Sequence, residues 1–416
     1  MKQLLLFLLM VLMSVATQAQ VWTTGTPIPE PMRASNAASY IKDGNGFLFM
    51  VSGRNSAGLI TPVHQRYDLS NNSWTTLADY PTGILGATAV TVKDSLYVIG
   101  GLVTTPGNAS RKVFKYSINS NTWTQKANYP TAIVDAKAVS YQDSLIYVIG
   151  GYQHLVRVYN THTNKWRSAT PILPPGGSLS WGGIAVKNDT LVYMCGTDNF
   201  LSSNYFNTVR IGVIDQNNRA NITWSEGTPF PGQTRTFFDA QPWKDGIIMT
   251  GGSTDNTFET NSNECYHYNV GTDTWTQLPS KPTAWLTGNS GSLFIDGEWK
   301  LICASGFGSD YLSQTEIFTE TTLSTVQPRS KCNLQDFQFL QDSTVHIRFC
   351  LEKEGTVDVN IRDMNGKLVK TLTNVASKSG SHDIRINTIS FPKGIYLCTL
   401  KQGKSVVTKK IVIDQK

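Results

Sequence analysis

Residues 94–123, DSLYVIGGLVTTPGNASRKVFKYSINSNTW, contain each part of the pattern that decides the fold. An Asp-Ser turn is followed by an apolar run that ends at Gly100-Gly101, then by a variable loop. A second run ends at Tyr116, and a polar turn leads to Trp123. Short apolar runs bounded by Gly, Asn and Ser turns are typical of β-hairpins. We therefore predict that this stretch forms successive antiparallel strands.

The same order of parts recurs about every fifty residues along the chain. Glycine pairs or their remnants close six apolar runs, at Ser52-Gly53, Gly100-Gly101, Gly150-Gly151, Cys195-Gly196, Gly251-Gly252 and Ser305-Gly306. A tryptophan follows five of them, at Trp74, Trp123, Trp166, Trp224 and Trp275, and all but Trp224 have a tyrosine seven residues earlier. A fixed period of this length indicates repeated units that bury their faces against one another.

These residues resemble the kelch repeat, whose marks are an apolar strand ending in Gly-Gly and a spaced Tyr and Trp. Six repeats in phase cover about 300 residues, and the resemblance implies an all-β fold with a six-bladed β-propeller over residues 20–320. The glycines permit close approach of backbone and positive φ, at Gly100, Gly101, Gly150, Gly151, Gly251 and Gly252. The aromatic residues fill the space between blades, at Tyr116, Trp123, Tyr159, Trp166, Tyr268 and Trp275.

The first and last repeats have complementary defects. Trp22 stands where a blade's outer strand would be, but the strands that should precede it are missing. The sixth repeat has Phe318 in place of the Tyr and no Trp after it. Pairing the two fragments would remove an exposed sheet edge. We therefore predict that the N-terminal strand becomes the outer strand of the last blade.

The N-terminus has the features of an export signal. Lys2 precedes the apolar run LLLFLLMVLM, and Thr17 and Ala19 occupy the −3 and −1 positions of a signal peptidase site. We predict a signal peptide over residues 1–19. A membrane anchor is the alternative, although the run is short for a bilayer, and we expect no transmembrane segment in the mature chain.

The C-terminal region has a different pattern. Residues 321–336 form a predicted polar linker, and residues 337–416 alternate in short strands typical of a small Ig-like β-sandwich. The stretches DVNIRDMNGKLVKTL, FPKGIYLCTLKQGK and KKIVI resemble the type A sorting domain of the Bacteroidetes type IX secretion system. The resemblance implies the type IX machinery as partner and a secreted or outer-membrane surface-attached protein. An ordinary Ig-like module, for example a carbohydrate-binding one, is the alternative.

Six cysteines in an exported chain raise the question of disulfides. Cys195, Cys265 and Cys303 fall in strands of the repeats, where we expect small buried side chains. A bridge between Cys350 and Cys398 is possible but not expected.

Composition and motifs exclude several classes of function. The net charge of +6 is modest, and no Lys/Arg cluster with interleaved aromatic residues predicts nucleic-acid binding. The six histidines are scattered without the spacing of a zinc site, so we expect no metal or other cofactor. No nucleophile elbow or phosphate loop is present.

The channel mouth of the predicted propeller remains as a site. Strands that follow Pro-containing links should be innermost, and their starting residues and the loops after the glycine pairs should meet on one face. Candidate ligand-binding residues at the strand starts are Arg33, Asp135, Trp181, Arg235, Asp239 and Trp285. Candidates in the loops are Arg54, Tyr152 and His154. Arg offers fixed donors and Trp a stacking face, and two Arg and two Trp converging on one axis would be unusual. The alternative is that these residues pair with one another or are solvated.

The sequence predicts a non-enzymatic, exported propeller that binds carbohydrate or protein through its channel-mouth face. One alternative is an enzyme similar to the sialic acid mutarotase, with Arg33, Arg235 and Asp239 holding a sugar acid and moving a proton. Another is a structural component of an adhesin.

Overall fold

The computed structural model describes residues 18–103, 107–199, 204–255, 259–322, 338–341, 344–351, 354–377, 380–387, 391–403 and 405–413. Two compact units divide the chain, one over Thr17–Thr322 and a second that contains Leu323–Lys416. All described regular elements in both units are β-strands. Residues 1–17, which hold most of the predicted signal peptide, lie outside the described residues.

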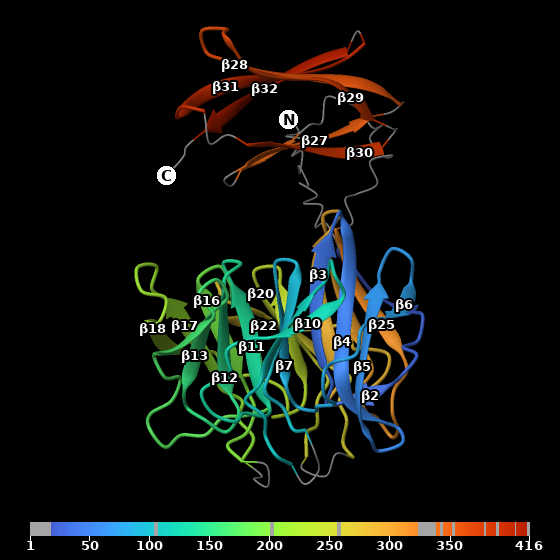
Figure 1. Ribbon diagram of the computed structural model, residues 1–416, viewed down its shortest axis with the longest axis vertical. Coiled ribbons are helices and arrows are strands. Elements are labelled where there is room, and N and C mark those ends of the chain that lie inside the picture. The colour runs from blue at the N-terminus through green and yellow to red at the C-terminus, as the bar shows by residue number, and fades with distance from the viewer. Residues whose placement is uncertain are drawn as a thin grey trace, which may run out of the picture. The chain divides into compact units, whose positions relative to one another are not determined.

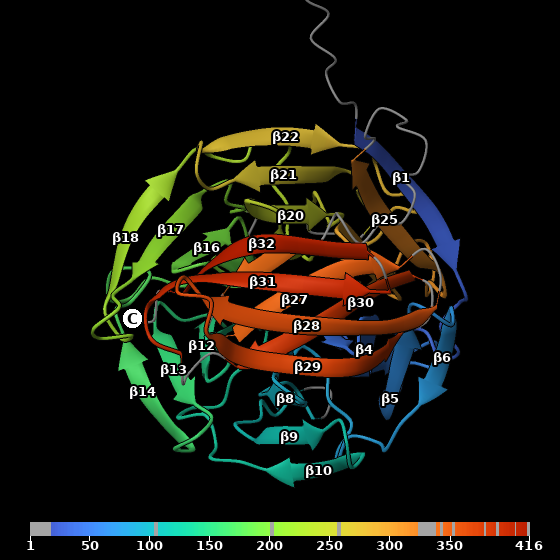
Figure 2. The same ribbon diagram turned by 90° about the horizontal axis from the view of Figure 1, so that it is seen from above.

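The first unit is a propeller of six antiparallel sheets, which Figure 2 shows as a ring. Blade 1 contains β3 (Asn36–Lys42), β4 (Asn45–Asn55), β5 (Ile60–Asp68) and β6 (Ser73–Thr76), with the short β2 (Met32–Arg33) also paired to β4. Blade 2 contains β7 (Thr88–Val92), β8 (Ser95–Ile99), β9 (Val113–Ser117) and β10 (Thr122–Gln125). Blade 3 contains β11 (Ala136–Tyr141), β12 (Leu145–Gly150), β13 (Val156–Asn160) and β14 (Lys165–Ala169).

The second half of the ring repeats this order. Blade 4 contains β15 (Gly183–Lys187), β16 (Thr190–Met194), β17 (Val209–Ile214) and β18 (Ile222–Gly227). Blade 5 contains β19 (Asp239–Trp243), β20 (Gly246–Thr250), β21 (Cys265–Asn269) and β22 (Thr274–Leu278). Blade 6 contains β23 (Asn289–Ile295), β24 (Glu298–Ala304), β25 (Thr315–Thr322) and β1 (Gln18–Gly25). The all-β, six-bladed prediction is confirmed.

Blade 6 closes the ring with strands from both ends of the propeller. β1 pairs antiparallel with β25 over its whole length, from Gln18 opposite Thr322 to Gly25 opposite Thr315. The Trp22 and Phe318 ring centroids lie 5.1 Å apart. Trp22 therefore supplies the tryptophan that the sixth repeat lacks and packs against the phenylalanine that replaces its tyrosine. The predicted closure is confirmed: β1 covers the edge of β25 and gives blade 6 four strands, as in blades 2 to 5.

In blades 1, 2, 3 and 5 the tyrosine and tryptophan of the repeat form a clasp on the link that leaves the preceding blade. In blade 2 the Tyr116 hydroxyl and the backbone N–H of Ala78 both donate to Asn121 Oδ1, at 2.7 and 2.9 Å. The Trp123 indole N–H donates to the Ala78 carbonyl at 3.0 Å. Both backbone groups of one link residue are therefore satisfied by the next blade. The same arrangement joins Tyr67, Asn72 and Trp74 to Thr26; Tyr159, Asn164 and Trp166 to Ala127; and Tyr268, Asp273 and Trp275 to Thr228.

The glycine pairs make the second contact between blades. Gly100 has φ +71°, and a Cβ there would lie 2.5 Å from the carbonyl oxygen of Ile133, on the link into blade 3. Where serine replaces the first glycine, its hydroxyl bonds to the link into the next blade: Ser52 Oγ accepts from Ile84 N–H at 2.7 Å. Ser305 Oγ similarly accepts from Met32 N–H at 2.6 Å. The pair thus fixes each link against the blade before it.

The second unit has two sheets facing a shared core. One contains β26 (Gln338–Gln341), β27 (Thr344–Leu351) and β30 (Gly380–Asn387). The other contains β28 (Gly355–Asp363), β29 (Leu368–Ser377), β31 (Gly394–Gln402) and β32 (Ser405–Ile413). Figure 1 shows these as the orange and red strands. Ile347 and Ile386 from the first sheet pack with Val359 and Leu400 from the second.

Four cysteine thiols are free and buried, at Cys195, Cys265, Cys303 and Cys398, whereas Cys332 and the side chain of Cys350 lie outside the described residues. The part of the chain that the structure describes contains no helical segment with the length and hydrophobicity of a membrane span.

The clasp predicts that two substitutions of Asn164 differ in their effect on the stability of the propeller. Asn164→Ala should lower the free energy of unfolding by about 2 kcal/mol, because the Tyr159 hydroxyl and the Ala127 N–H lose their shared acceptor and alanine must adopt φ near +56°. Asn164→Asp should cost much less, because Asp273 fills this position in blade 5. Urea unfolding of the two variants measures the difference, and an equal loss in both would contradict the clasp.

Candidate functional site

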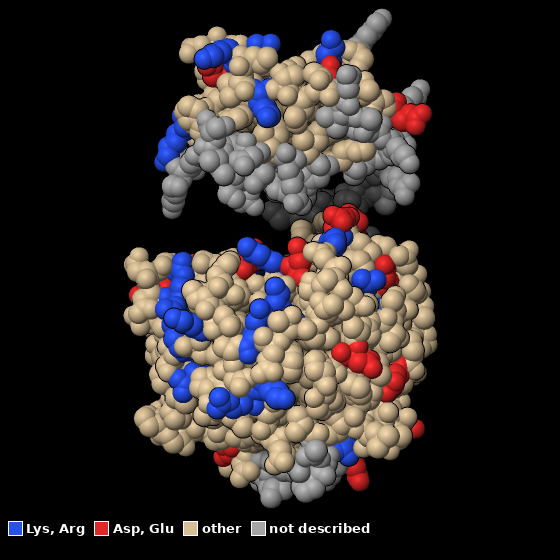
Figure 3. Space-filling view, viewed as in Figure 1, with Lys and Arg blue, Asp and Glu red and all other residues tan. Residues whose placement is uncertain are grey.

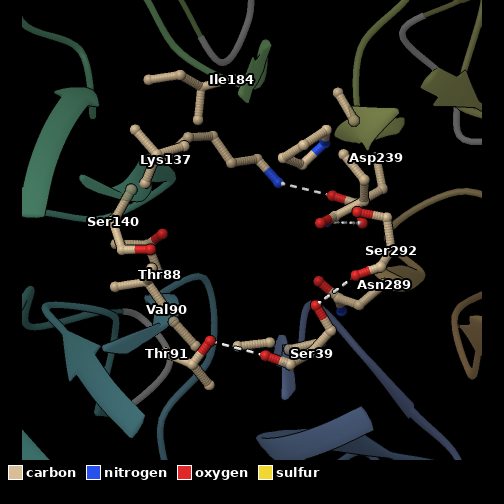
Figure 4. Close-up of a pocket in the computed structure, with 18 of the residues that line it drawn as sticks. Ser39, Thr88, Val90, Thr91, Lys137, Ser140, Ile184, Asp239, Asn289 and Ser292 are labelled. Atoms are coloured by element: carbon tan, nitrogen blue, oxygen red, sulfur yellow. Dashed lines mark hydrogen bonds and ion pairs between the residues drawn. The ribbon is translucent and has the colours of Figure 1, made fainter. Parts of the chain in front are cut away.

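The first strands of the six blades line a cavity along the propeller axis. β3, β7, β11, β15, β19 and β23 surround a volume of about 350 Å³, viewed down the axis in Figure 4. Its polar lining comes from hydroxyl and amide side chains, among them Ser39, Thr88, Thr91, Ser140, Asn289 and Ser292. The Ser39 and Thr91 hydroxyls donate to carbonyls of neighbouring inner strands, at 2.9 and 2.7 Å. The predicted innermost strands are confirmed.

One ion pair supplies the charge in this lining. Lys137 Nζ lies 3.6 Å from Asp239 Oδ1, and Figure 4 shows it reaching toward that carboxylate. Asp239 Oδ2 accepts from the backbone N–H and the hydroxyl of Ser290, both at 2.7 Å, and from Gln241 Nε2 at 3.1 Å. Asp239 is therefore fixed by its blade and the next, whereas the Lys137 side chain keeps 30% of its surface exposed.

A ring of residues in left-handed conformation surrounds the end of the cavity where the inner strands begin. We call these six residues, one per blade, the entry ring: Ala34, Gly86, Asp135, Trp181, Phe237 and Thr287, with φ between 48° and 61°. Backbone hydrogen bonds connect them, from Asp135 N to Gly86 O at 2.7 Å and from Gly86 N to Ala34 O at 3.0 Å. Positive φ is tolerated poorly by bulky side chains, so tertiary packing holds Trp181 and Phe237 there.

All six members of the entry ring line a pocket of about 80 Å³ at the mouth, and the three from blades 3, 4 and 5 bring the large side chains. The Trp181 and Phe237 ring centroids are 4.0 Å apart, and Tyr152 packs edge-on to Trp181 at 6.1 Å. The Tyr152 hydroxyl donates to Asp135 Oδ2 at 3.3 Å. The mouth pocket shares Lys137 and Asn289 with the axial cavity, so the two form one candidate site.

Asp135 has an altered acidity in this pocket. Burial raises the pKa of its carboxyl to about 6, against hydrogen bonds from Trp181 and Tyr152 and the positive charge of Lys137, which lower it. Burial and the adjacent carboxyl also raise the pKa of Tyr152. A carboxyl that titrates near pH 6 beside a cavity can hold or release a proton at neutral pH.

Comparison with known proteins agrees with the propeller fold and with a separate C-terminal domain. Residues 48–315, more than half of the chain, match the family described as the Attractin/LZTR1 beta-propeller. The chain belongs to this family. Residues 341–414 match the secretion system C-terminal sorting domain. The sorting domain indicates involvement of the type IX secretion system and export from the cell or to its surface.

Two individual proteins show more distant likeness to this Attractin/LZTR1-type propeller. Alpha-scruin of Limulus polyphemus is 35% identical over 72 residues, which span 16% of this chain and only 8% of that protein. A solved structure titled "Structure of YjhT" aligns with a TM-score of 0.57 at 17% identity, over 72% of this chain and 97% of that one. At this identity the alignment supports the fold alone.

The predicted site residues are divided between the axis and the interior of the propeller. Asp135, Tyr152, Trp181 and Asp239 lie at the mouth or in the cavity. Arg235 and Trp285 instead lie between blades, so the expected convergence of two Arg and two Trp on the axis does not form. Each stands two residues before the entry ring, at the position that Met32, Ile84, Ile133 and Leu179 fill in the other blades.

Arg235 is fully buried at this interblade position. Its Nη2 forms an ion pair with Glu264 at 2.5 Å, and its Nη1 donates to the Gly251 carbonyl at 3.2 Å and to Ser262 Oγ at 2.9 Å. Trp285 is 1% exposed, with the Lys281 ammonium 4.5 Å from its ring centroid. These side chains stabilise the junctions around blade 5.

The remaining candidates lie outside the lining of the site. Arg33 and Arg54 are opposite each other in the β2–β4 pair, and the Arg33 guanidinium lies 5.1 Å from the Phe307 ring centroid. The His154 carbonyl accepts from Ile172 N–H at 3.0 Å. Among the described residues, no group of three or more His, Cys, Asp or Glu side chains could hold a metal ion.

Lys137 and Phe237 line the site but are not among the residues predicted from the sequence. Lys137 lies in β11, two residues after the entry-ring residue Asp135, and lines both the axial cavity and the mouth pocket. Phe237 stands in the fifth repeat where Trp181 stands in the fourth. The signal in the sequence is position within the repeat, because Phe237 occupies the entry-ring position and Lys137 lies two residues after that position in blade 3.

The acidity of Asp135 predicts a pH-dependent gain in stability for Asp135→Asn. A raised pKa means that the neutral carboxyl stabilises the native state below about pH 4, and that this stability is lost as pH rises through about 6. The amide never ionises, and Asn tolerates positive φ. The stability of the variant relative to the native chain should therefore increase between pH 4 and pH 8, by at most about 3 kcal/mol. Urea unfolding at both values tests this, and a pH-independent difference would refute it.

Proposed function

We propose that this exported propeller is a binding module whose channel-mouth site takes a carbohydrate group. The observation that carries the proposal is that the mouth pocket, with its aromatic wall of Trp181 and Phe237, continues into an axial cavity lined by both polar and apolar side chains. A sugar ring offers an apolar face and a rim of hydroxyls. Aromatic rings accommodate the first, and hydroxyl, amide and charged side chains the second.

The dimensions and chemistry of the cavity support a small ligand. A volume of about 350 Å³ lies within the range of small-molecule sites. The Lys137 ammonium has three donors and only a long 3.6 Å contact with Asp239, so donors remain for a ligand oxygen. Asp239, two blades along the ring in blade 5, draws this ammonium toward the axis. A protein ligand, by contrast, would contact the face around the mouth rather than fill the cavity.

Lys137→Met tests the module. We expect a glycan array to identify carbohydrate ligands of the exported chain, and this variant to bind the best of them at least ~10-fold more weakly, because a charge-assisted hydrogen bond is lost. Lys42→Met is the matched control, since Lys42 is exposed at the opposite end of an inner strand. An array without any ligand, or equal losses in both variants, would count against the proposal. Capture of a surface protein with no glycan binding would favour a protein ligand.

A second candidate function rests on the carboxyl of Asp135. In an enzyme similar to the sialic acid mutarotase, a base takes the proton of the anomeric hydroxyl while an acid protonates the ring oxygen, and the ring C–O bond breaks. A carboxyl with a pKa of about 6 in the mouth pocket is suited to the first step. Because Arg235 is buried against Glu264, any sugar acid would be held by Lys137 instead.

The two functions can be separated by measurement. If Asp135 is a base, exchange between the anomers of a reducing sugar, followed by NMR, should accelerate as pH rises through about 6. Asp135→Asn should return the rate to that of buffer. Exchange no faster than buffer with the native protein would exclude this enzyme function for the sugar tested and leave the binding module in place.

A further inference from the structure

Charge is distributed very unevenly around the propeller. Residues 95–188, which cover most of blades 2 and 3, contain nine Lys and Arg and two Asp, a formal net charge of 9 − 2 = +7. Residues 189–322 contain six Lys and Arg and fifteen Asp and Glu, a formal net charge of 6 − 15 = −9. The modest charge of +6 for the whole chain therefore conceals one basic side and one acidic side.

The basic side is an outer surface. Of the nine cations, Lys137 lies in the axial cavity and Lys187 lies over the Trp299 ring. We call the other seven the basic wall: Arg111, Lys112, Lys115, Lys126, Arg157, Lys165 and Arg167. All seven are exposed or half-buried. Figure 3 shows Lys and Arg gathered over the region where Figure 1 labels β11, β12 and β13.

The cations of the basic wall have no carboxylate partners among the described residues, whereas five of the six cations in residues 189–322 do, the exception being Arg219. Lys244 pairs with Glu320 at 2.6 Å and Lys300 with Glu298 at 3.0 Å. On the basic wall the corresponding contact is neutral, since Arg157 donates to the Ser168 hydroxyl. Uncompensated like charges on one surface attract a polyanion and gain from the release of its counterions.

A groove between blades 3 and 4 adjoins the basic wall. It encloses about 500 Å³, its charged lining residues are Lys165, Arg167 and Arg219, and it has no carboxylate among its lining residues. Arg219 belongs to blade 4 and contacts two residues of blade 3: its carbonyl accepts from the Tyr147 hydroxyl at 2.6 Å, and its guanidinium lies 5.7 Å from the Tyr141 ring centroid. Gln142, Ser144, Asn160 and Thr163 complete the groove with neutral polar groups.

We propose that the basic wall and this groove form a second binding surface, distinct from the channel mouth, for an acidic polysaccharide. Arginine and lysine bind carboxylate, sulfate or phosphate groups, and the neutral polar residues of the groove suit sugar hydroxyls. The sorting domain directs the chain to export, where polysaccharides are available. Nucleic acid is disfavoured because Trp166, the aromatic residue in the groove, packs 4.8 Å from both Tyr129 and Tyr159 and donates to the Ala127 carbonyl, so it is not free to stack on bases.

The test compares two double variants of the full exported chain that lose equal charge. Lys165→Gln with Arg167→Gln changes the groove, whereas Lys42→Gln with Lys300→Gln changes cations far from it in the chain. Probes are dextran sulfate, polygalacturonate, uncharged dextran and a short DNA duplex, with binding measured by biolayer interferometry at 50 and 200 mM salt. Urea unfolding of each variant establishes that both are folded.

We expect the native chain to bind one or both acidic polysaccharides and not dextran, with affinity decreasing as salt increases. The groove variant should bind at least ~10-fold more weakly at 50 mM salt with a smaller salt slope, and the control variant within about twofold of the native chain. Equal losses in both double variants, equal binding to dextran, or no binding to either acidic polysaccharide would overturn the proposal. Tighter binding to the DNA duplex would overturn the choice of polysaccharide. The channel-mouth proposal is tested independently, because Lys137 is unchanged in these variants.

Discussion

The structure depends on how each blade fixes the link that enters it. A link crosses the junction between two sheets, where its backbone groups have no strand partner and must be satisfied otherwise. In the link between blades 1 and 2, the clasp binds Ala78 to Trp123, and Ser52 then bonds to Ile84. Two residues later Gly86 joins the entry ring. Each link is thus fixed to the blade ahead, to the blade behind and to the axis, which sets the angle between sheets.

The candidate site is a consequence of this constraint. The entry ring must adopt positive φ for the chain to turn from the link into the inner strand, whichever residue occupies it. Glycine does so freely at one position, whereas Trp181 and Phe237 do so at a cost that the surrounding junctions offset. As a result, the side chains of the entry ring are held at the rim of the cavity by backbone that is hydrogen-bonded to its neighbours in the ring.

The sequence predicts the scaffold well because the scaffold signals are local and repeated. Glycine pairs, the Tyr and Trp spacing and the two half-blades each recur or complement one another, so the six blades and their closure follow. The site was only partly predictable, because a shift of one or two residues along the link decides whether a side chain faces the axis or lies between blades. Arg235 and Phe237 are two residues apart, yet one is sealed between blades and the other lines the mouth. The hydrogen-bonding role of Asn121 was missed for a similar reason: a turn asparagine needs no further explanation until its partner from the preceding blade is known.

Departures from the repeat are informative only when the structure leaves them uncompensated. Arg235 departs from the apolar pattern of its position, but Glu264 and Ser262 satisfy it within the junction. It is therefore a local substitution of an ion pair for a hydrophobic contact, which carries no implication of a ligand. The basic wall differs from Arg235, because its positive charges are not compensated by ion pairs among the described residues. Its cations are spread over 57 residues of sequence, from Arg111 to Arg167, so no linear cluster is visible. The fold gathers Lys and Arg on one side (Figure 3), and within the described part of the chain no carboxylate forms an ion pair with the seven. A closed ring whose junctions are satisfied internally does not need that charge for its own stability, which is why the imbalance is best explained by something outside the chain.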